Sequence, residues 1–301
     1  MNTKLTIAVI TMNRAAQLKE ALESCLACRL PEKTEFVIID NASTDHTQQV
    51  VAQVMEGCGY PYYYEKLPKN IGAGAGRNAY FSKAKGEFVY GMDDDAVIAA
   101  EQNPDFFIKA IDIMERNSKI GALATQVFDT AWNCNRQTVD GLQISTGVYK
   151  CKTFCGGSHF LRKGAFEKPP YFPNTYGYEE LPPSLLVMDA GLLNVFVPEL
   201  LVTHKPKVNK WDWTDEKNHA LLANECAVPY AIKKMMYPGV FQPLVFLAYA
   251  ARVHKYLGKY PQAAKKCRQL VGETMEKYKL DQRIKVKTVV KMCKDFGLAI
   301  F

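Results

Sequence analysis

The sequence lacks the long apolar run that a membrane-spanning helix requires. Its longest apolar stretch, residues 240–251, contains Gln242 and Pro243 and is shorter than the roughly 20 residues needed to cross a bilayer. The N-terminal apolar stretch is short, and no A-x-A cleavage site of a signal peptide follows it. Internal repeats and low-complexity segments are also missing. We therefore predict a globular chain without a membrane span, located in the cytoplasm.

Cysteine usage gives no sign of a disulfide framework. The nine cysteines are an odd number at irregular spacing in a chain without an export signal, so reduced thiols are expected. Cys25 and Cys28 form one short pair, and the group Cys134, Cys151, Cys155 and His159 contains another. Structural zinc sites usually show paired short spacings, and this group offers only one short pair, so buried free thiols are the favoured interpretation.

Negative charge is scarce in the C-terminal third. Residues 205–301 contain 19 Lys and Arg against 8 Asp and Glu, a net charge of +11, whereas residues 1–204 carry −4. A basic, aromatic-rich segment of this kind suits an anionic membrane surface, and it equally suits a solvated helical face that keeps the protein in solution. No recognised nucleic-acid motif accompanies the charge, so no nucleic-acid partner is predicted.

The first 130 residues alternate short apolar runs with segments of helical period. Buried strands are predicted at residues 5–10, 35–39 and 87–92, with a helix over 15–28 between the first two. A second helix after Asp40 is expected to have its N-cap at Ser43 or Thr44. This βαβ pattern predicts a mostly parallel sheet flanked by helices, in which ligands bind beyond the carboxyl ends of the strands.

The rest of the chain reads as two further regions. Residues 131–162 are irregular with short β-like runs, and a helix beginning at Pro182 precedes a strand at 192–198. Beyond His204 the sequence becomes helical and basic. The predicted organisation is an α/β domain over 1–204 with a division near residue 95, followed by a helical C-terminal region over 205–301.

Three consecutive carboxylates, Asp93, Asp94 and Asp95, follow the apolar run at 87–92. They repel one another, so a cation is expected among them. Hard oxygen ligands suit Mg²⁺ or Mn²⁺, which keep coordination positions open for substrate phosphates. The alternative is an acidic turn that caps the next helix.

A glycine-rich segment over residues 70–78, NIGAGAGRN, opens a predicted helix. Glycines there allow backbone N–H groups to approach a phosphate or a base. The segment matches neither G-x-G-x-x-G nor a Walker loop, so a plain flexible turn remains the alternative.

These motifs, taken in order, resemble the inverting family 2 glycosyltransferases with the GT-A fold, and in particular bacterial rhamnosyl- and galactofuranosyl-transferases. The resemblance covers roughly residues 4–225. IAVITMNR resembles the family's first strand, VIIDNASTDHT its nucleotide loop, NIGAGAGRN its glycine-rich segment and GMDDDAV its D-x-D metal motif. FCGGSHFLRKGAFE resembles the segment before its acceptor site, and GLLNVFVPELLVTH its strand ending in histidine.

The resemblance implies a GT-A catalytic domain over 1–204, with a nucleotide-binding half at 1–95 and an acceptor-binding half at 96–204, and a role for each matching residue. Nucleotide-sugar binding would fall to Thr11, Asn13, Arg14, Asp40, Asn41, Ser43, Asn70, Gly72, Arg77, Asn78, Asp93 and Asp94. Asp40 would accept from the base, and Thr11 and Arg77 would line the nucleotide pocket. Mn²⁺ or Mg²⁺ would be held by Asp93, Asp95 and His204, and the acceptor would meet Gly156, Gly157 and His159.

Glu179 and Glu180 lie where the family has its E-D-x-D motif, and Glu180 would be the general base. Glu179 lies twelve residues before Gly191, which is the usual spacing. However, Pro182 replaces the second acid of the motif, and Leu186 occupies the position where the family usually has an arginine. These departures affect the expected recognition of the acceptor more than the base. A pair of solvated acids near a helix start is the structural alternative.

The implied function is transfer of a sugar, hexosyl or deoxyhexosyl, from a nucleoside-diphosphate sugar to a hydroxyl. The acceptor would be a glycan or a lipid-linked glycan of surface polysaccharide or glycolipid biosynthesis, with the basic C-terminal region in peripheral contact with the inner face of the membrane. Two alternatives stay open. A nucleotidyltransferase also uses acidic metal ligands after a parallel strand, and a non-catalytic nucleotide-sugar-binding module could use the same scaffold.

Overall fold

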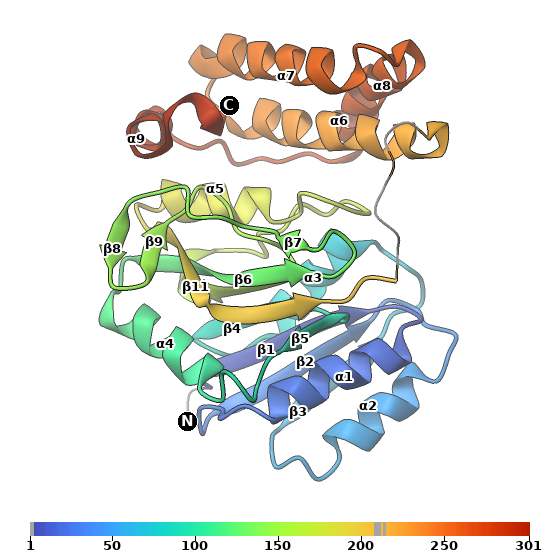
Figure 1. Cartoon of the computed structure of the whole chain (residues 1–301), viewed down its shortest axis with the longest axis vertical. Helices are drawn as coiled ribbons and strands as arrows, with labels where there is room; N and C mark the ends of the chain where they lie inside the picture. Colours follow the sequence, from blue (N-terminus) through green and yellow to red (C-terminus); the bar gives the residue numbers. More distant parts are fainter. Residues whose placement is uncertain (1–2, 208–211, 213–214) are drawn as a thin grey trace. The chain divides into compact units, whose positions relative to one another are not determined.

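The structure is a computed structural model that describes residues 3–207, 212 and 215–301. The chain forms two compact units, Met1–Val208 and Asn209–Phe301. Figure 1 traces the chain through both of them. The boundary expected after residue 204 lies four residues before this division.

A mixed sheet forms the centre of the first unit, with the strand order β3-β2-β1-β4-β10-β6-β11-β9-β8. Its main strands are β1 (Leu5–Thr11), β2 (Thr34–Asp40), β3 (Tyr62–Lys66), β4 (Phe88–Asp93), β6 (Ile120–Asp129), β10 (Ser158–Arg162) and β11 (Leu193–His204). Shorter strands are β5 (Ala96–Ile98), β7 (Cys134–Asn135), β8 (Gln143–Ser145) and β9 (Val148–Lys150). Apart from β10, the main strands all run in one direction.

The parallel register brings polar strand ends to one edge of the sheet. Thr11 at the end of β1 lies opposite Asp40 at the end of β2, and Ile10 lies opposite Asp93 of β4. On the other side of β10, His204 at the end of β11 lies opposite Asp129 of β6. Ligands of parallel sheets bind at this carboxyl edge.

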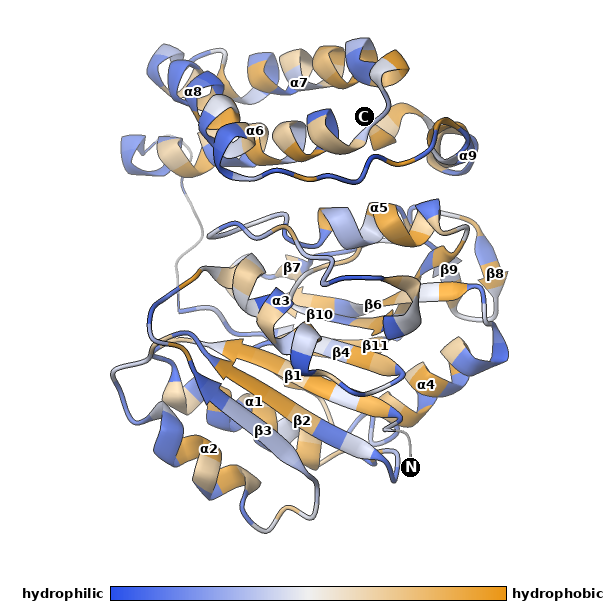
Figure 2. Cartoon of the chain, turned by 180° about the vertical axis from the view of Figure 1, so that it is seen from behind, coloured by the Kyte–Doolittle hydropathy of each residue, from blue (hydrophilic) through white to orange (hydrophobic). Residues whose placement is uncertain are grey.

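Helices cover both faces of the sheet because most side chains of β1, β2 and β4 are apolar and buried in both directions. α1 (Ala15–Leu26), α2 (Thr47–Met55) and α4 (Phe106–Arg116) pack on one face through a shared core. α3 (Ala73–Lys83) and α5 (Leu181–Asp189) pack on the other. Figure 2 shows hydrophobic residues along β1 and β2, whereas the edge strand β3 is hydrophilic.

The predicted α/β fold with a mostly parallel, helix-flanked sheet is confirmed, and the helix at Pro182 forms as α5 with proline in its first turn. The expected N-cap of α2 at Ser43 or Thr44 is wrong. The helix begins at Thr47, whose backbone N–H donates to Asp45 Oδ1 at 3.1 Å. The predicted strand over 192–198 is longer, because β11 continues to His204 through a register shift between Val197 and Leu201.

The second unit is helical in its described part, as predicted. It contains α6 (His219–Met236), α7 (Gln242–Leu257), α8 (Pro261–Lys277) and α9 (Val286–Phe296), with short 3₁₀ turns before α6, between α6 and α7, and after α9. Its core is formed mainly by α6 and α8, with Leu257 from the end of α7. Among the described residues no helix has both the length and the apolar character required to cross a membrane.

The first turn of α3 packs directly on backbone. Gly74 donates its N–H to Asn174 O at 3.1 Å, and a Cβ on Gly74 would lie 1.7 Å from Phe172 O. Real Cβ atoms do not come so close to a carbonyl oxygen, so this position admits only glycine unless the backbone moves. The glycine-rich motif therefore brings α3 into contact with the segment that precedes Glu179.

We predict that Gly74→Ala destabilises the first unit. Forcing a methyl group into a packed site costs about 1–3 kcal/mol, and here the clashing atom belongs to the backbone. The control is Gly272→Ala in α8, where a Cβ would meet nothing within 4 Å. This change should instead stabilise its helix by about 1 kcal/mol. Urea unfolding followed by circular dichroism measures both effects, and equal stability of the two variants would contradict the assignment.

Candidate active site

The three carboxylates at the end of β4 are held by two arginines, Arg14 and Arg77. Asp94 accepts from Thr11 Oγ1 at 2.7 Å and from Arg14 Nη1 at 3.0 Å. Asp95 accepts from the same Arg14 nitrogen at 2.7 Å. Asp93 forms an ion pair with the guanidinium of Arg77. Burial raises the pKa of Asp94 to about 6 even though the positive charge of Arg14 opposes the shift.

The described part of the chain contains one possible metal site, formed by Asp93, Asp95 and His204. One ligand atom of each lies within 4.8 Å of the others. His204 Nε2 is 3.1 Å from Asp95 Oδ1 and 4.0 Å from Asp93 Oδ2. Asp95 Oδ1 is buried without a hydrogen bond. Two carboxylates and one imidazole whose ligand atoms converge fit a divalent cation such as Mn²⁺ or Mg²⁺.

Asp129, which the sequence did not single out, holds His204 in place. Its Oδ2 lies 2.8 Å from His204 Nδ1, and Arg136 Nε donates to the same oxygen at 2.8 Å. Backbone N–H groups of Ala131 and Trp132 complete its partners at 3.0 Å each. A carboxylate behind a histidine ligand fixes the tautomer and the ring orientation. The available signal was an aspartate at the end of an apolar run, as at Asp40 and Asp93.

The Arg77 guanidinium lies in the protein interior, with 2% of the side chain exposed. Besides Asp93, its Nε lies 3.4 Å from Glu179 Oε1, and its Nη1 donates to the Tyr80 hydroxyl at 3.4 Å. Arg77 therefore joins a carboxylate of the metal set to the acidic pair in front of α5.

Glu179 and Glu180 have different surroundings. Glu179 is buried and faces Arg77, whereas Glu180 is half-buried and its side chain does not cap α5. Burial, and then the negative charge of Glu179, raise the pKa of Glu180 to about 8. A carboxylate with that pKa can take up a proton near neutral pH.

Gly156 and Gly157 lie between the acidic pair and Asp93. A Cβ on Gly156 would approach Glu179 Oε1 at 3.2 Å and Glu180 Oε2 at 3.5 Å, and a Cβ on Gly157 would approach Asp93 Oδ2 at 3.1 Å. The missing side chains leave space beside these carboxylates. The two glycines, which are predicted to contact the acceptor, thus lie next to both the predicted catalytic pair and the predicted metal ligand Asp93.

His159 lies under this surface, with no exposed area. Its Nε2 shares a hydrogen bond of 2.7 Å with the hydroxyl of Tyr171, and its ring stacks on Phe154 at a centroid distance of 4.6 Å. Burial, and then the charge of Arg77, lower its pKa to about 3, so the ring is neutral. In this structure other residues cover His159, so an acceptor would not contact its side chain directly.

The predicted nucleotide loop forms one hydrogen-bonded network at the carboxyl edge. Asp40 accepts from Ser43 N and from the Tyr64 hydroxyl, at 2.7 Å each. Ser43 Oγ in turn accepts from the backbone of Asn13 at 2.9 Å. Asp40 is 1% exposed, so its carboxylate is already engaged with protein groups. Tyr64, on β3, is a second residue that sequence reasoning missed.

The glycine-rich segment joins this network and continues toward Tyr171. Asn41 Nδ2 donates to Asn70 Oδ1 at 2.7 Å, and Gly72 N donates to the same oxygen at 2.8 Å. Gly72 has a φ of 88°, a conformation that favours glycine. Asn78 brackets the backbone of Tyr171, donating to its carbonyl at 2.8 Å and accepting from its N–H at 2.9 Å. In this structure Asn78 therefore positions α3.

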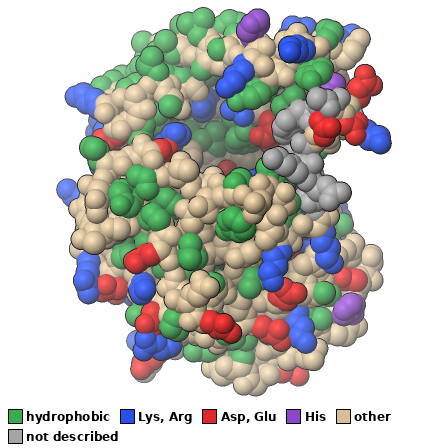
Figure 3. All heavy atoms as spheres, viewed as in Figure 1, with side chains coloured by type: hydrophobic (Ala, Val, Ile, Leu, Met, Phe, Trp, Pro, Cys, Tyr) green, Lys and Arg blue, Asp and Glu red, His purple; other side chains and the backbone are tan. Residues whose placement is uncertain are grey.

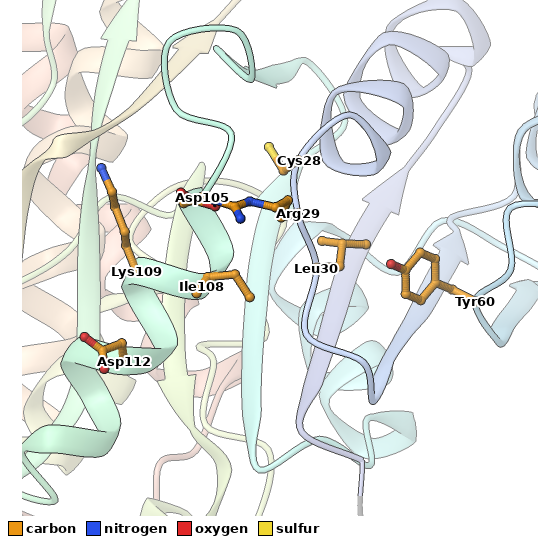
Figure 4. A pocket seen from close by; sticks show the side chains of 8 residues that line it. All are labelled: Cys28, Arg29, Leu30, Tyr60, Asp105, Ile108, Lys109 and Asp112. Atoms are coloured by element: carbon orange, nitrogen blue, oxygen red, sulfur yellow. The ribbon is translucent and has the colours of Figure 1, made fainter.

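A separate hollow of about 720 Å³ lies elsewhere on the first unit (Figure 4). It is lined by Cys28, Arg29, Leu30, Tyr60, Asp105, Ile108, Lys109 and Asp112. They come from the segment after α1, from the loop between α2 and β3, and from α4 with the residue before it, and none of them belongs to the predicted site. The side chains of Arg29 and Asp105 pair within the hollow.

All nine cysteines of the chain, Cys28 included, are unpaired thiols.

The sequence profile "Glycosyl transferase family 2" matches residues 6–168, more than half of the chain. The chain belongs to this glycosyltransferase family. The match includes β1, β2, β4 and the carboxylates that follow β4. It ends before Glu179, Glu180 and His204, so those roles stay predictions.

Solved structures share the fold of this family 2 glycosyltransferase. A mannosyltransferase of Pyrobaculum calidifontis, in complex with GDP-mannose and Mn²⁺, has a TM-score of 0.59 at 18% identity, covering 100% of this chain and 81% of that one. TarS of S. aureus, residues 1–349 with UDP-GlcNAc, has a TM-score of 0.63 at 15% identity, covering 91% and 81%.

A curated relative by sequence is the undecaprenyl-phosphate 4-deoxy-4-formamido-L-arabinose transferase of Pseudomonas savastanoi pv. phaseolicola. It is 26% identical over 149 residues, which are 48% of this chain and 43% of the relative. The matches between this chain and its curated relatives span at most 65% of the length of each relative.

We predict that binding of a divalent cation displaces a proton from His204. Burial lowers the pKa of His204, but its ion pair with Asp95 and the charges of Asp93 and Asp95 outweigh this effect and raise the pKa to about 9. Below that pH the ring is protonated, so affinity for Mn²⁺ should increase about tenfold per pH unit from pH 6 to pH 8.

Calorimetry in buffers of different ionisation enthalpy should detect the released proton. The control, His204→Gln, should bind Mn²⁺ weakly and lose most of the pH dependence. An affinity of the natural chain that does not change between pH 6 and pH 8 would contradict the assignment of His204 as a ligand.

Proposed function

We propose that this chain is an inverting, divalent-cation-dependent glycosyltransferase. It would transfer a hexosyl or deoxyhexosyl group from a nucleoside-diphosphate sugar to a hydroxyl of a glycan or lipid-linked glycan, in surface polysaccharide or glycolipid biosynthesis. The observation that carries the proposal is the pair of acidic groups, one containing Asp93 and the other Glu179 and Glu180, on either side of Gly156 and Gly157. Family membership and nucleotide-sugar complexes of proteins with the same fold support it.

Inverting transfer needs two functions on opposite sides of the anomeric carbon. One carboxylate takes the proton of the acceptor hydroxyl, and positive charge stabilises the departing nucleoside diphosphate. Glu180, half-buried with a pKa raised to about 8, is suited to the first function. A cation held by Asp93, Asp95 and His204 would supply Lewis acidity for the second.

Arg77 and Glu179 would position these groups. Because Arg77 contacts both Asp93 and Glu179, it holds the metal side and the base side at a constant separation. Glu179, facing Arg77, keeps a negative charge beside Glu180 and so contributes to the raised pKa of Glu180. We assign Glu180 as the base and Glu179 as a positioning residue.

The donor would occupy the carboxyl edge of the N-terminal strands. Residues 1–95 contain the network of Asp40, Asn41 and Asn70, and form the proposed nucleotide half. Residues 96–204 supply Gly156 and Gly157 and form the proposed acceptor half. The sequence resemblance to rhamnosyl- and galactofuranosyl-transferases supports a hexosyl or deoxyhexosyl donor. The transferase from Pseudomonas, named for undecaprenyl phosphate, supports a lipid-linked acceptor.

We predict that Asp95→Ala abolishes cation-dependent binding of nucleoside diphosphates. The change removes a hard ligand and leaves the phosphate charge uncompensated, so affinity should fall by about two orders of magnitude or more, since even outer contacts to metal ligands are worth about 10- to 100-fold. Calorimetric titration with UDP and GDP, with and without Mn²⁺, measures the effect. Asp112→Ala, remote from the site, is the control. Unchanged Mn²⁺-dependent affinity in Asp95→Ala would refute the assignment.

We predict that Glu180→Gln lowers turnover by about 10²- to 10⁴-fold while donor binding survives, because general-base catalysis is worth that much and the nucleotide is held elsewhere. The natural enzyme should gain activity with increasing pH up to about pH 8, as Glu180 loses its proton. The matched control is Glu179→Gln, which should keep most activity and shift this pH profile to lower pH, because a neighbouring negative charge is removed.

Slow, Mn²⁺-dependent release of nucleoside diphosphate from the donor provides the assay. The reverse ranking of the two variants would move the base to Glu179. Full activity in both variants would make the pair structural. Release of pyrophosphate instead of nucleoside diphosphate would identify a nucleotidyltransferase, and no turnover with any donor would favour a binding module.

A further inference from the structure

Helix α7 takes little part in the core of the C-terminal unit. Only Val245 and Leu257 of its sixteen residues are buried, whereas α6 buries ten of eighteen. Tyr249 faces inward and stacks on Tyr230 of α6, with ring centroids 4.0 Å apart. The opposite face of α7 is therefore free of contacts to this core.

That outer face is apolar. Val240 just before the helix, and Leu244 and Leu247 within it, recur at intervals of three or four residues and are 69%, 40% and 61% exposed. Phe246 beside them is 54% exposed. Figure 3 shows hydrophobic side chains gathered over α7 on this unit. Side chains at this spacing share one face of a helix, so they form a continuous apolar stripe. We call Val240, Leu244 and Leu247 the α7 stripe; Phe246 lies on an adjacent face, because residues one or two positions apart do not share a helix face.

The chain around the stripe carries positive charge alone. Residues 226–272 contain no Asp or Glu, and their eight cations are Lys233, Lys234, Arg252, Lys255, Lys259, Lys265, Lys266 and Arg268. Lys234 lies near the start of α7, because Gln242 Nε2 donates to its carbonyl at 3.1 Å. Lys255 lies in the last turn, 5.0 Å from the centroid of the Tyr256 ring. Lysine residues therefore lie near both ends of α7.

We propose that the α7 stripe docks on an anionic lipid bilayer, with α7 lying flat in the headgroup region. An apolar face flanked by cations matches such a surface, where side chains enter the acyl boundary and Lys or Arg pair with lipid phosphates. A second copy of the chain bound symmetrically would bring the same cations together, and residues 226–272 offer no Asp or Glu to neutralise them. A nucleic acid would neutralise the cations but leave the stripe in water. The proposal does not depend on the proposed function.

The test is flotation of the full chain with vesicles of phosphatidylcholine, alone or mixed with phosphatidylglycerol. The chain should float with the mixed vesicles at low salt, weakly with phosphatidylcholine, and less as salt increases. The variant Leu244→Ser with Leu247→Ser should weaken binding by about tenfold or more, because two exposed apolar side chains are lost. Lys255→Glu with Lys259→Glu should weaken it by at least about fivefold per position, the equivalent of about 1 kcal/mol each.

Matched controls separate the stripe from general hydrophobicity and net charge. Leu142→Ser removes a leucine that is 66% exposed in the first unit. Lys119→Glu with Lys168→Glu reverses two exposed charges outside 226–272. Both controls should float like the natural chain. Unchanged circular dichroism spectra and melting temperatures would show that every variant is folded.

Three results would overturn the proposal: no flotation with the mixed vesicles at low salt, equal binding by the α7 variants and the natural chain, or equal loss in the controls. Sedimentation equilibrium adds a fourth. If the natural chain is a dimer and Leu244→Ser with Leu247→Ser makes it a monomer, the stripe is covered by a second copy and not by lipid.

Discussion

The buried charge of Arg77 is the constraint on which the site depends. Removing a guanidinium from water costs several kcal/mol unless charged partners replace the lost hydration. Arg77 obtains them from Asp93 at the end of β4 and from Glu179 in front of α5, two segments that are far apart in sequence. Because both carboxylates contact the same buried guanidinium, the metal side and the base side are held together before any ligand arrives.

The arrangement around Arg77 requires a close approach of α3, and the glycines make that approach possible. Gly74 lets the first turn of the helix lie against the carbonyl of Phe172, and Asn78 then brackets Tyr171. Tyr171 in turn shares a hydrogen bond with His159 under the glycine pair. The motif that suggested contact with a phosphate thus also performs a packing function, which explains why so many of its polar groups are bonded to protein.

The sequence allowed the sheet edge to be predicted because parallel strands end together. The apolar runs before Thr11, Asp40 and Asp93 were sufficient to place these residues side by side. It could not reveal Asp129, whose contact with His204 depends on the register of β6 against β11, strands separated by more than sixty residues. Nor could it show that His159 and Arg77 are buried, since a motif records residue type but not depth. The N-cap of α2 was misplaced because Asp45, Ser43 and Thr44 are all good capping residues and tertiary contacts decide among them.

The position of His204 at the end of β11 has a mechanical consequence. The chain leaves the sheet through this residue, Lys205 N donates to Asp95 O at 2.8 Å, and the second unit begins only a few residues later, at 209. Tension applied to the C-terminal unit would therefore reach the peptide backbone of His204 and Asp95 first. The carboxylate of Asp129 and the β11–β6 ladder fix the imidazole at the point where the chain leaves the sheet.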